Sequence, residues 1–255
     1  MKKTLISEMS WYEFRDAMAM NDLIIIPTGS IEAHGPHNPL GTDLILAREL
    51  ARRIGERAQV PVAPAVPIGC CHTLTQFPGT VSLDPMLLRR LLVEICESYI
   101  PHGAKRFLFI NGHGGNAAPI KMACSDLHQA HENILAVQSE WWTTVPQISE
   151  YPCNDHGGKY ETSAVLSVDE SLCDMSRAKT VPRKPLTDQL TFDYKFHFRG
   201  ATLPLSGGIP LRELTPYANF GAPAEEASKE LGDKVTQIYV DYGVALVEEM
   251  KRVYL

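Results

Sequence analysis

One short stretch of the chain decides the expected fold: residues 106–116 read RFLFINGHGGN. Its first five residues predict a strand buried on both faces of a sheet, because four of them are large and apolar. The three glycines that follow predict a sharp turn, and we expect a helix from there to about Ala130. A strand, a tight turn and a helix in this order form the repeating unit of a parallel sheet.

The same pattern occurs elsewhere along the chain. Residues 23–27 (LIIIP) and 134–139 (ILAVQS) predict two further strands, and prolines make residues 60–68 an irregular or edge strand. Helices are expected over residues 42–56, 84–100, 161–168 and 224–252, the last with a break near Gly232, whereas residues 176–222 are expected to be irregular. Alternating strands and helices predict an α/β fold, with a mostly parallel sheet covered by helices on both faces. We expect one domain spanning residues 1–255, since no linker separates two cores.

Composition excludes several classes of protein. The 255 residues are 44% apolar and 21% charged, which is typical of a globular chain. A net charge of −6 provides no basic surface, so we expect no nucleic-acid partner. No apolar run approaches the ~18 residues that cross a bilayer, and no apolar segment follows Lys2 and Lys3, so neither a membrane partner nor a secretory signal is expected. The six cysteines form no C-x-x-C pair; we expect free thiols, a cytoplasmic location and no thiolate zinc site.

Acidic and imidazole side chains gather after the first predicted strand. Residues 29–37 read GSIEAHGPH, and residues 41–43 read GTD. In extended backbone Glu32 and His34 point the same way, and Asp43 follows at the start of a helix. Carboxylate oxygens and imidazole nitrogens suit Zn, Mn or Fe, and loops beyond the strand ends are where open α/β sheets bind ligands. The alternative is a loop whose polar residues only satisfy backbone groups.

Two later motifs add residues of the same kind. His113 lies in the glycine-rich turn after the second strand, where an anion cradle with an incidental histidine is the alternative. Residues 155–163 read DHGGKYETS and supply His156 and Glu161. There the alternative is a helix start, with Glu161 compensating the helix dipole.

Five blocks of sequence together resemble the creatininase family. They occur in the family's order and extend across almost the whole chain: GSIEAHGPHNPLGTD (29–43), FPGTVSLD (77–84), FINGHGGN (109–116), HGGKYETS (156–163) and NFGAPAEEASKELG (219–232). The resemblance implies a three-layer α/β/α sandwich, a two-metal site at the strand ends and hydrolysis of a C–N amide-type bond. It also implies a homo-oligomer, commonly a hexamer.

The resemblance assigns roles residue by residue. Glu32 and His113 match ligands of one metal, His34 matches a ligand of the other, and Asp43 matches the carboxylate that bridges both. Creatininase itself has an aromatic residue and a ligating glutamate where this chain has Gly114 and Gly115.

The second metal must therefore be completed differently, and Glu161 is the candidate. His156 matches a histidine placed for proton transfer; the alternative is a third imidazole ligand.

The sequence thus predicts a metal-dependent hydrolase with two divalent ions (Zn, Mn or Fe) per chain. Its substrate would be a small cyclic amide, formamide or lactam, attacked by a metal-bound hydroxide. The alternatives are a lactone hydrolase with the same site, a non-catalytic metal-stabilised binding protein, and a thiol hydrolase using Cys70 or Cys71.

Weaker expectations concern further side chains near these motifs. His37 is either a partner of a ligand or a surface residue, and His72 either lines the pocket or is an exposed loop residue. Trp141 and Trp142 are expected to form a pocket wall, a core contact or an interface. Residues 192–198 (FDYKFHF) are expected to form an edge strand or a subunit contact.

Overall fold

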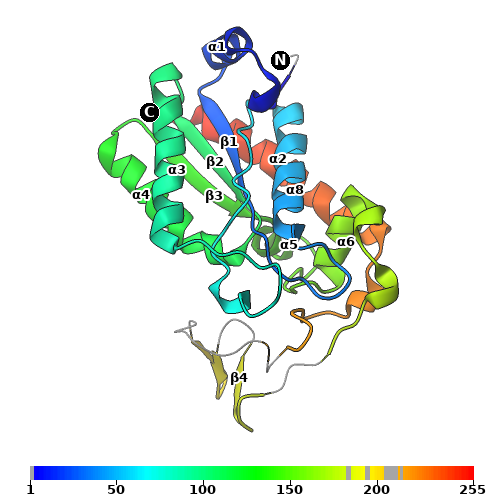
Figure 1. Cartoon of the computed structure of the whole chain (residues 1–255). Helices are drawn as coiled ribbons and strands as arrows, with labels where there is room; N and C mark the ends of the chain where they lie inside the picture. The colour runs from blue at the N-terminus through cyan, green and yellow to red at the C-terminus, as the bar shows by residue number, and fades with distance from the viewer. Residues whose placement is uncertain (1–2, 182–184, 193–195, 204–211, 213–214) are drawn as a thin grey trace.

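A three-stranded parallel sheet forms the centre of the molecule (Figure 1). The structure is a computed structural model that describes residues 3–181, 185–192, 196–203, 212 and 215–255. The strands are β1 (Leu23–Thr28), β2 (Arg106–Asn111) and β3 (Leu135–Glu140), with β2 in the middle. Outside β1, Val62 and Val66 make isolated parallel bridges to Ile25 and Thr28, so the irregular edge segment expected over residues 60–68 is confirmed.

Helices cover both faces of this sheet. Successive side chains of a strand point to opposite faces, so Leu23 and Ile25 belong to one core cluster while Ile24 and Ile26 belong to another. The first cluster packs against α2 (Thr42–Ala58) and α8 (Lys229–Arg252), and the second against α3 (Pro85–Tyr99) and α4 (Ala117–Ala130) (Figure 1). The expected three-layer α/β/α arrangement is therefore confirmed.

Several helix starts follow from local sequence. Asp84 accepts hydrogen bonds from the backbone N–H groups of Met86 and Leu87, and Pro85 occupies the first position of α3. The predicted helices correspond to α2, α3, α4, α6 (Lys159–Val168) and α8, whereas α1 (Trp11–Met20) and α5 (Trp141–Ile148) were not predicted. Short 3₁₀ turns complete this set: η1 (Ile6–Glu8), η2 (His72–Leu74), η3 (Ile100–His102), η4 (Gly114–Asn116), η5 (Glu170–Leu172), η6 (Met175–Arg177) and η7 (Ala224–Glu226).

The break expected near Gly232 was wrong. Gly232 lies within the continuous helix α8, and a Cβ atom built there would overlap the carbonyl oxygen of Ser163 in α6. The glycine therefore allows two helix backbones to approach each other closely. This contact holds α6, which carries Glu161, against the body of the fold.

A small antiparallel sheet lies within the region expected to be irregular. Its strands are β4 (Leu190–Phe192), β5 (Phe196–Phe198) and β6 (Ala201–Leu203). β4 and β5 pair antiparallel, with Phe192 opposite Phe196, so the single edge strand expected over 192–198 was wrong. Its two ends belong to two different strands, and residues 193–195 lie outside the described residues. In Figure 1 this sheet lies apart from the central one, at one end of the molecule. Among the described residues, no helix is long and apolar enough to cross a membrane.

Candidate metal centre

The five predicted ligands converge beyond the carboxyl ends of β1 and β2. Glu32 and His34 come from the loop after β1, Asp43 from the first turn of α2, His113 from the turn after β2, and Glu161 from the first turn of α6. All five side chains are buried or nearly so, and Glu32 is only 1% exposed. Ionisable groups buried this deeply must be paired or bound to a cation.

One half of the cluster surrounds His113. Its Nδ1 lies 3.1 Å from Glu32 Oε1 and 3.2 Å from Asp43 Oδ2. The other ring nitrogen, Nε2, lies 3.0 Å from the carbonyl oxygen of Cys70 and donates to it. This hydrogen bond leaves Nδ1 as the lone-pair nitrogen of the neutral ring, facing the carboxylates, as a metal ligand requires.

The other half surrounds His34. Its Nε2 lies 3.1 Å from Asp43 Oδ1 and 3.5 Å from Glu161 Oε2. Its Nδ1 lies 3.0 Å from the backbone carbonyl of Glu32, to which it donates, so the lone pair is again on the nitrogen that faces the carboxylates. Glu161 is held in place by the backbone N–H of Gly157, which donates to Oε2 at 2.6 Å.

One polar atom of this cluster has no hydrogen-bond partner. It is Glu32 Oε2, which is fully enclosed. A buried polar atom without a partner costs free energy, so such a group calls for a ligand. Donor atoms within 4.8 Å of one another form three overlapping groups: Glu32, Cys71 and His113; Glu32, His34 and His156; and His34, Asp43 and Glu161. The residues present therefore fit divalent metal ions.

Charge within the cluster shifts the imidazole pKa values. Burial alone lowers the pKa of His34, but the negative charges of Asp43 and Glu161 raise it well above its usual value. Burial likewise lowers the pKa of His113, and the charge of Glu32 with hydrogen bonds to Asp43 and Cys71 raises it well above the ordinary range. In the metal-free protein these rings hold protons where metal ions would otherwise supply positive charge.

His156 lies beside this cluster with its ring fixed. Its Nε2 donates to the carbonyl of Ala33 at 2.9 Å, and its Nδ1 lies 3.9 Å from both Glu32 Oε1 and Glu161 Oε2. Burial and the neighbouring charge of His34 hold the pKa of His156 well below its ordinary value. The ring is therefore neutral and turns an unprotonated nitrogen toward the centre.

Asp155 positions the start of α6. Its carboxylate accepts hydrogen bonds from the backbone N–H groups of Tyr160 and Glu161, at 2.7 and 3.2 Å. Burial and the charge of Glu161 raise the pKa of Asp155 to about 7. Asp155 thus fixes the first turn of α6, and through it the position of Glu161.

A cavity of about 740 Å³ opens above the cluster. Its lining includes Glu32, Asp43, His113, His156 and Glu161, so it gives a substrate access to the centre. This volume is within the range of small-molecule sites.

The weaker expectations have mixed outcomes. Trp142 and the exposed His72 both line the cavity, whereas Trp141 is buried in the core at 2% exposure. A surface role for His37 was wrong, because it is buried and its Nε2 lies 3.0 Å from Thr162 Oγ1 in α6.

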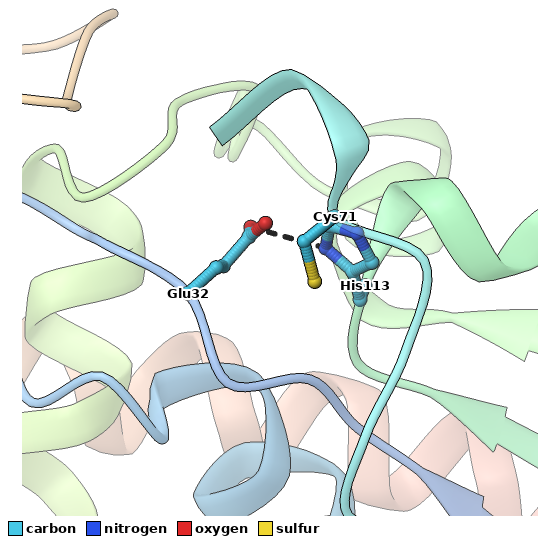
Figure 2. Close-up of side chains that lie close together, drawn as sticks. All are labelled: Glu32, Cys71 and His113. Atoms are coloured by element: carbon cyan, nitrogen blue, oxygen red, sulfur yellow. Dashed lines mark ion pairs between the residues drawn. The ribbon is translucent and has the colours of Figure 1, made fainter. Parts of the chain in front are cut away.

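Cys71 is a residue of the cluster that the sequence analysis did not name as a candidate ligand. Figure 2 shows its side chain between those of Glu32 and His113. The neighbouring Cys70 is no candidate nucleophile, since burial raises the pKa of its thiol to about 11. The sequence around Cys70-Cys71 contains no metal-binding motif, such as C-x-x-C, that would have indicated a ligand.

Comparison with known proteins agrees with this geometry. The family model described as "Creatininase: Creatinine amidohydrolase" matches residues 7–247. The chain belongs to the creatininase family. It is 27% identical to the creatinine amidohydrolase of Pseudomonas putida, over 96% of this chain and 95% of that protein. It is 32% identical to the mycofactocin precursor peptide peptidase of Mycolicibacterium smegmatis, over 86% of this chain and 76% of that protein.

A solved structure called "Creatininase Mn" has the same fold as this creatininase-family chain. The TM-score is 0.78 at 26% identity, covering 98% of this chain and 99% of the other. Family membership makes the chain an enzyme, a metal-dependent hydrolase of the amidohydrolase class. The alternatives of a non-catalytic binding protein and a thiol hydrolase are therefore wrong.

Proposed function

We propose that the chain hydrolyses the C–N bond of a small neutral amide at a centre of two divalent ions. Glu32, His113 and Asp43 would hold the first ion, and His34, Glu161 and Asp43 would hold the second. The observation that carries this assignment is Asp43, whose two oxygens face two different imidazoles. The mixed oxygen and nitrogen donors suit Zn, Mn or Fe.

The chemistry divides between the ions and the chain. When bound, two divalent ions make water a nucleophile near neutral pH and polarise a carbonyl. His156, with its unprotonated Nδ1 facing the centre, would accept a proton from the attacking water and pass it to the leaving nitrogen. The hydrogen bond to Ala33 keeps that ring oriented throughout. Backbone N–H groups near Gly114 and Gly115, which line the cavity, would hold a developing oxyanion.

The cavity lining supports a neutral substrate. Trp142, Leu74 and Pro85 provide apolar surface, and Thr73, Thr143 and Asn154 provide neutral hydrogen-bonding groups. Neither lysine nor arginine occurs among the lining residues that the structure describes. A carboxylate-bearing or phosphorylated substrate would therefore lack a counter-charge, whereas a cyclic amide, lactam or formamide needs none.

A substrate screen tests this function directly. Metal-loaded protein would be assayed on small cyclic amides, formamides, lactams and lactones. We expect turnover of at least one neutral amide, lost in Asp43→Asn and kept in the control Asp241→Asn, an exposed acid on α8. Turnover of lactones alone would favour the lactone hydrolase alternative. Turnover that survives Asp43→Asn would contradict the proposed centre.

We also propose a closed homo-oligomer, a hexamer, in a reducing cytoplasm. The six cysteines are all free, which suits that compartment. The apolar surface comes from α1, where Trp11 and Met20 are each 67% exposed, rather than from the Trp141-Trp142 pair originally expected to provide it. Light scattering that gives the 28.3 kDa monomer mass at micromolar protein would refute the oligomer.

A further inference from the structure

The thiol of Cys71 belongs to the donor cluster on the Glu32 side. Its Sγ lies within 4.8 Å of a carboxylate oxygen of Glu32 and of a ring nitrogen of His113. The three side chains come from three separate loops and lie close together (Figure 2). One of them, Glu32, is 1% exposed and has an oxygen, Oε2, without a hydrogen-bond partner. The thiol therefore lies beside a buried carboxylate that has an unsatisfied acceptor atom.

The surrounding structure holds this thiol in a fixed place. Cys71 is 1% exposed, and its backbone N–H donates to Ser82 Oγ at 2.9 Å. Its Sγ is hydrogen-bonded to the hydroxyl of Ser30, which is itself fully buried just after β1. A serine hydroxyl can donate to a thiolate, so Ser30 would stabilise the sulfur in its ligating form.

Gly115 allows the loop that carries Cys71 to approach the cluster closely. A Cβ atom built on Gly115 would overlap both the Cys70 carbonyl oxygen and the ring of His113. A side chain at 115 therefore cannot coexist with the Cys70 backbone in this place. The glycine thus lets the Cys70-Cys71 segment lie against the His113 side of the cluster.

We propose that Cys71 Sγ is a thiolate ligand of the metal ion held by Glu32, His113 and Asp43, an inference that rests on the proposed two-metal function. On binding, the S–H bond breaks, its proton leaves to solvent and a sulfur–metal bond forms. Four anionic side chains, Glu32, Asp43, Glu161 and Cys71, then balance the +4 charge of two divalent ions. A soft sulfur donor makes this one position selective for zinc over manganese.

Cobalt substitution tests the sulfur bond without using activity. Co²⁺ alone would be loaded into the full-length wild-type protein, Cys71→Ser and Cys70→Ala. Cys71→Ser keeps the volume and the hydrogen bond to Ser30 but replaces sulfur with oxygen. Cys70→Ala is the matched control, because the Cys70 side chain packs in the core cluster beside α3 and α4. Circular dichroism would establish that each variant is folded.

We expect a sulfur-to-cobalt charge-transfer band in the near ultraviolet for wild-type protein and Cys70→Ala, and its loss in Cys71→Ser. We also expect Cys71→Ser to lower the zinc-over-manganese preference of one site by more than ~10-fold, the low end of the cost of losing a metal-centre contact. Wild-type protein that binds two cobalt ions without this band would overturn the inference while leaving the two-metal function intact. Protein that binds no cobalt would overturn both.

Discussion

Asp43 directs its two carboxylate oxygens at two different imidazoles: Oδ1 lies 3.1 Å from His34 Nε2, and Oδ2 lies 3.2 Å from His113 Nδ1. The residue is 2% exposed and lies in the first turn of α2, which fixes its backbone. One carboxylate therefore joins the two halves of the cluster. The first prediction follows from this geometry.

Asp43→Ala should lose both metal ions, because each half of the centre loses an oxygen donor. Glu32→Ala should empty mainly the half that contains His113, since Glu32 lies 3.1 Å from that ring and 3.9 Å from His34. Elemental analysis of gently purified protein measures both outcomes, with wild-type protein expected near two ions per chain. Full metal content and activity in Asp43→Ala would rule out the bridging role.

His156→Ala should keep both metal ions and lose on the order of 10²–10⁴ in kcat, the usual contribution of general acid–base catalysis. The loss should be smaller for substrates with good leaving groups, which need no proton. Metal analysis and kinetics on a substrate pair that differs in leaving group would check this. A variant that loses an ion would instead make His156 a ligand, the alternative that its Nδ1 position leaves open.

Metal binding should release protons. In the metal-free protein the pKa values of His34 and His113 are raised, so both rings are charged near neutral pH. A group whose pKa is higher in the folded than in the unfolded protein stabilises the metal-free fold at pH values below its unfolded-state pKa. This stabilisation is lost as the pH rises through its folded-state pKa. We therefore expect metal-free protein to lose stability, and metal affinity to increase, as the pH rises above about 6.5, the ordinary histidine pKa.

Calorimetric titration with Zn²⁺ in buffers of different ionisation enthalpy would count the protons released. Thermal unfolding of the metal-free protein at about pH 6 and at a more alkaline pH would follow its stability. His34→Gln should release fewer protons than wild-type protein, because one charged ring is absent. Binding that releases no protons at the lower pH would contradict the raised pKa values.

Gly232→Ala should destabilise the fold by about 1–3 kcal/mol, the usual cost of overpacking. Its Cβ would overlap a backbone carbonyl, that of Ser163, which cannot move without shifting α6. Gly243→Ala is the matched control on the same helix, because its Cβ would meet the side chain of Ile54 rather than a backbone atom. Denaturant unfolding should show the larger loss for Gly232→Ala; equal or reversed losses would contradict the close approach of α6 and α8.

Local pattern in the sequence was sufficient for the central elements. The apolar runs at 23–27 and 106–110 are the strands β1 and β2, and Asp84-Pro85 begins α3 where the capping pattern predicted. Each of these signals depends on neighbouring residues along the chain. The helix α5 was missed because Trp141-Trp142 follows β3 directly, with no capping side chain at Glu140 to indicate a start.

By itself, the sequence determined that buried strands alternate with helices and that five ligand-type residues lie at strand or helix ends, since residue type and spacing encode both. Only the tertiary structure decided which donors meet. Ser30 and Cys71 are 41 residues apart, and Asp155 holds the first turn of α6 through two backbone N–H groups. Such contacts depend on how loops fold back over the sheet. Local periodicity in the sequence does not predict which distant residues come into contact. The role of Gly232 could not be predicted for the same reason. A side chain is excluded at this position by the carbonyl of Ser163, which lies on another helix.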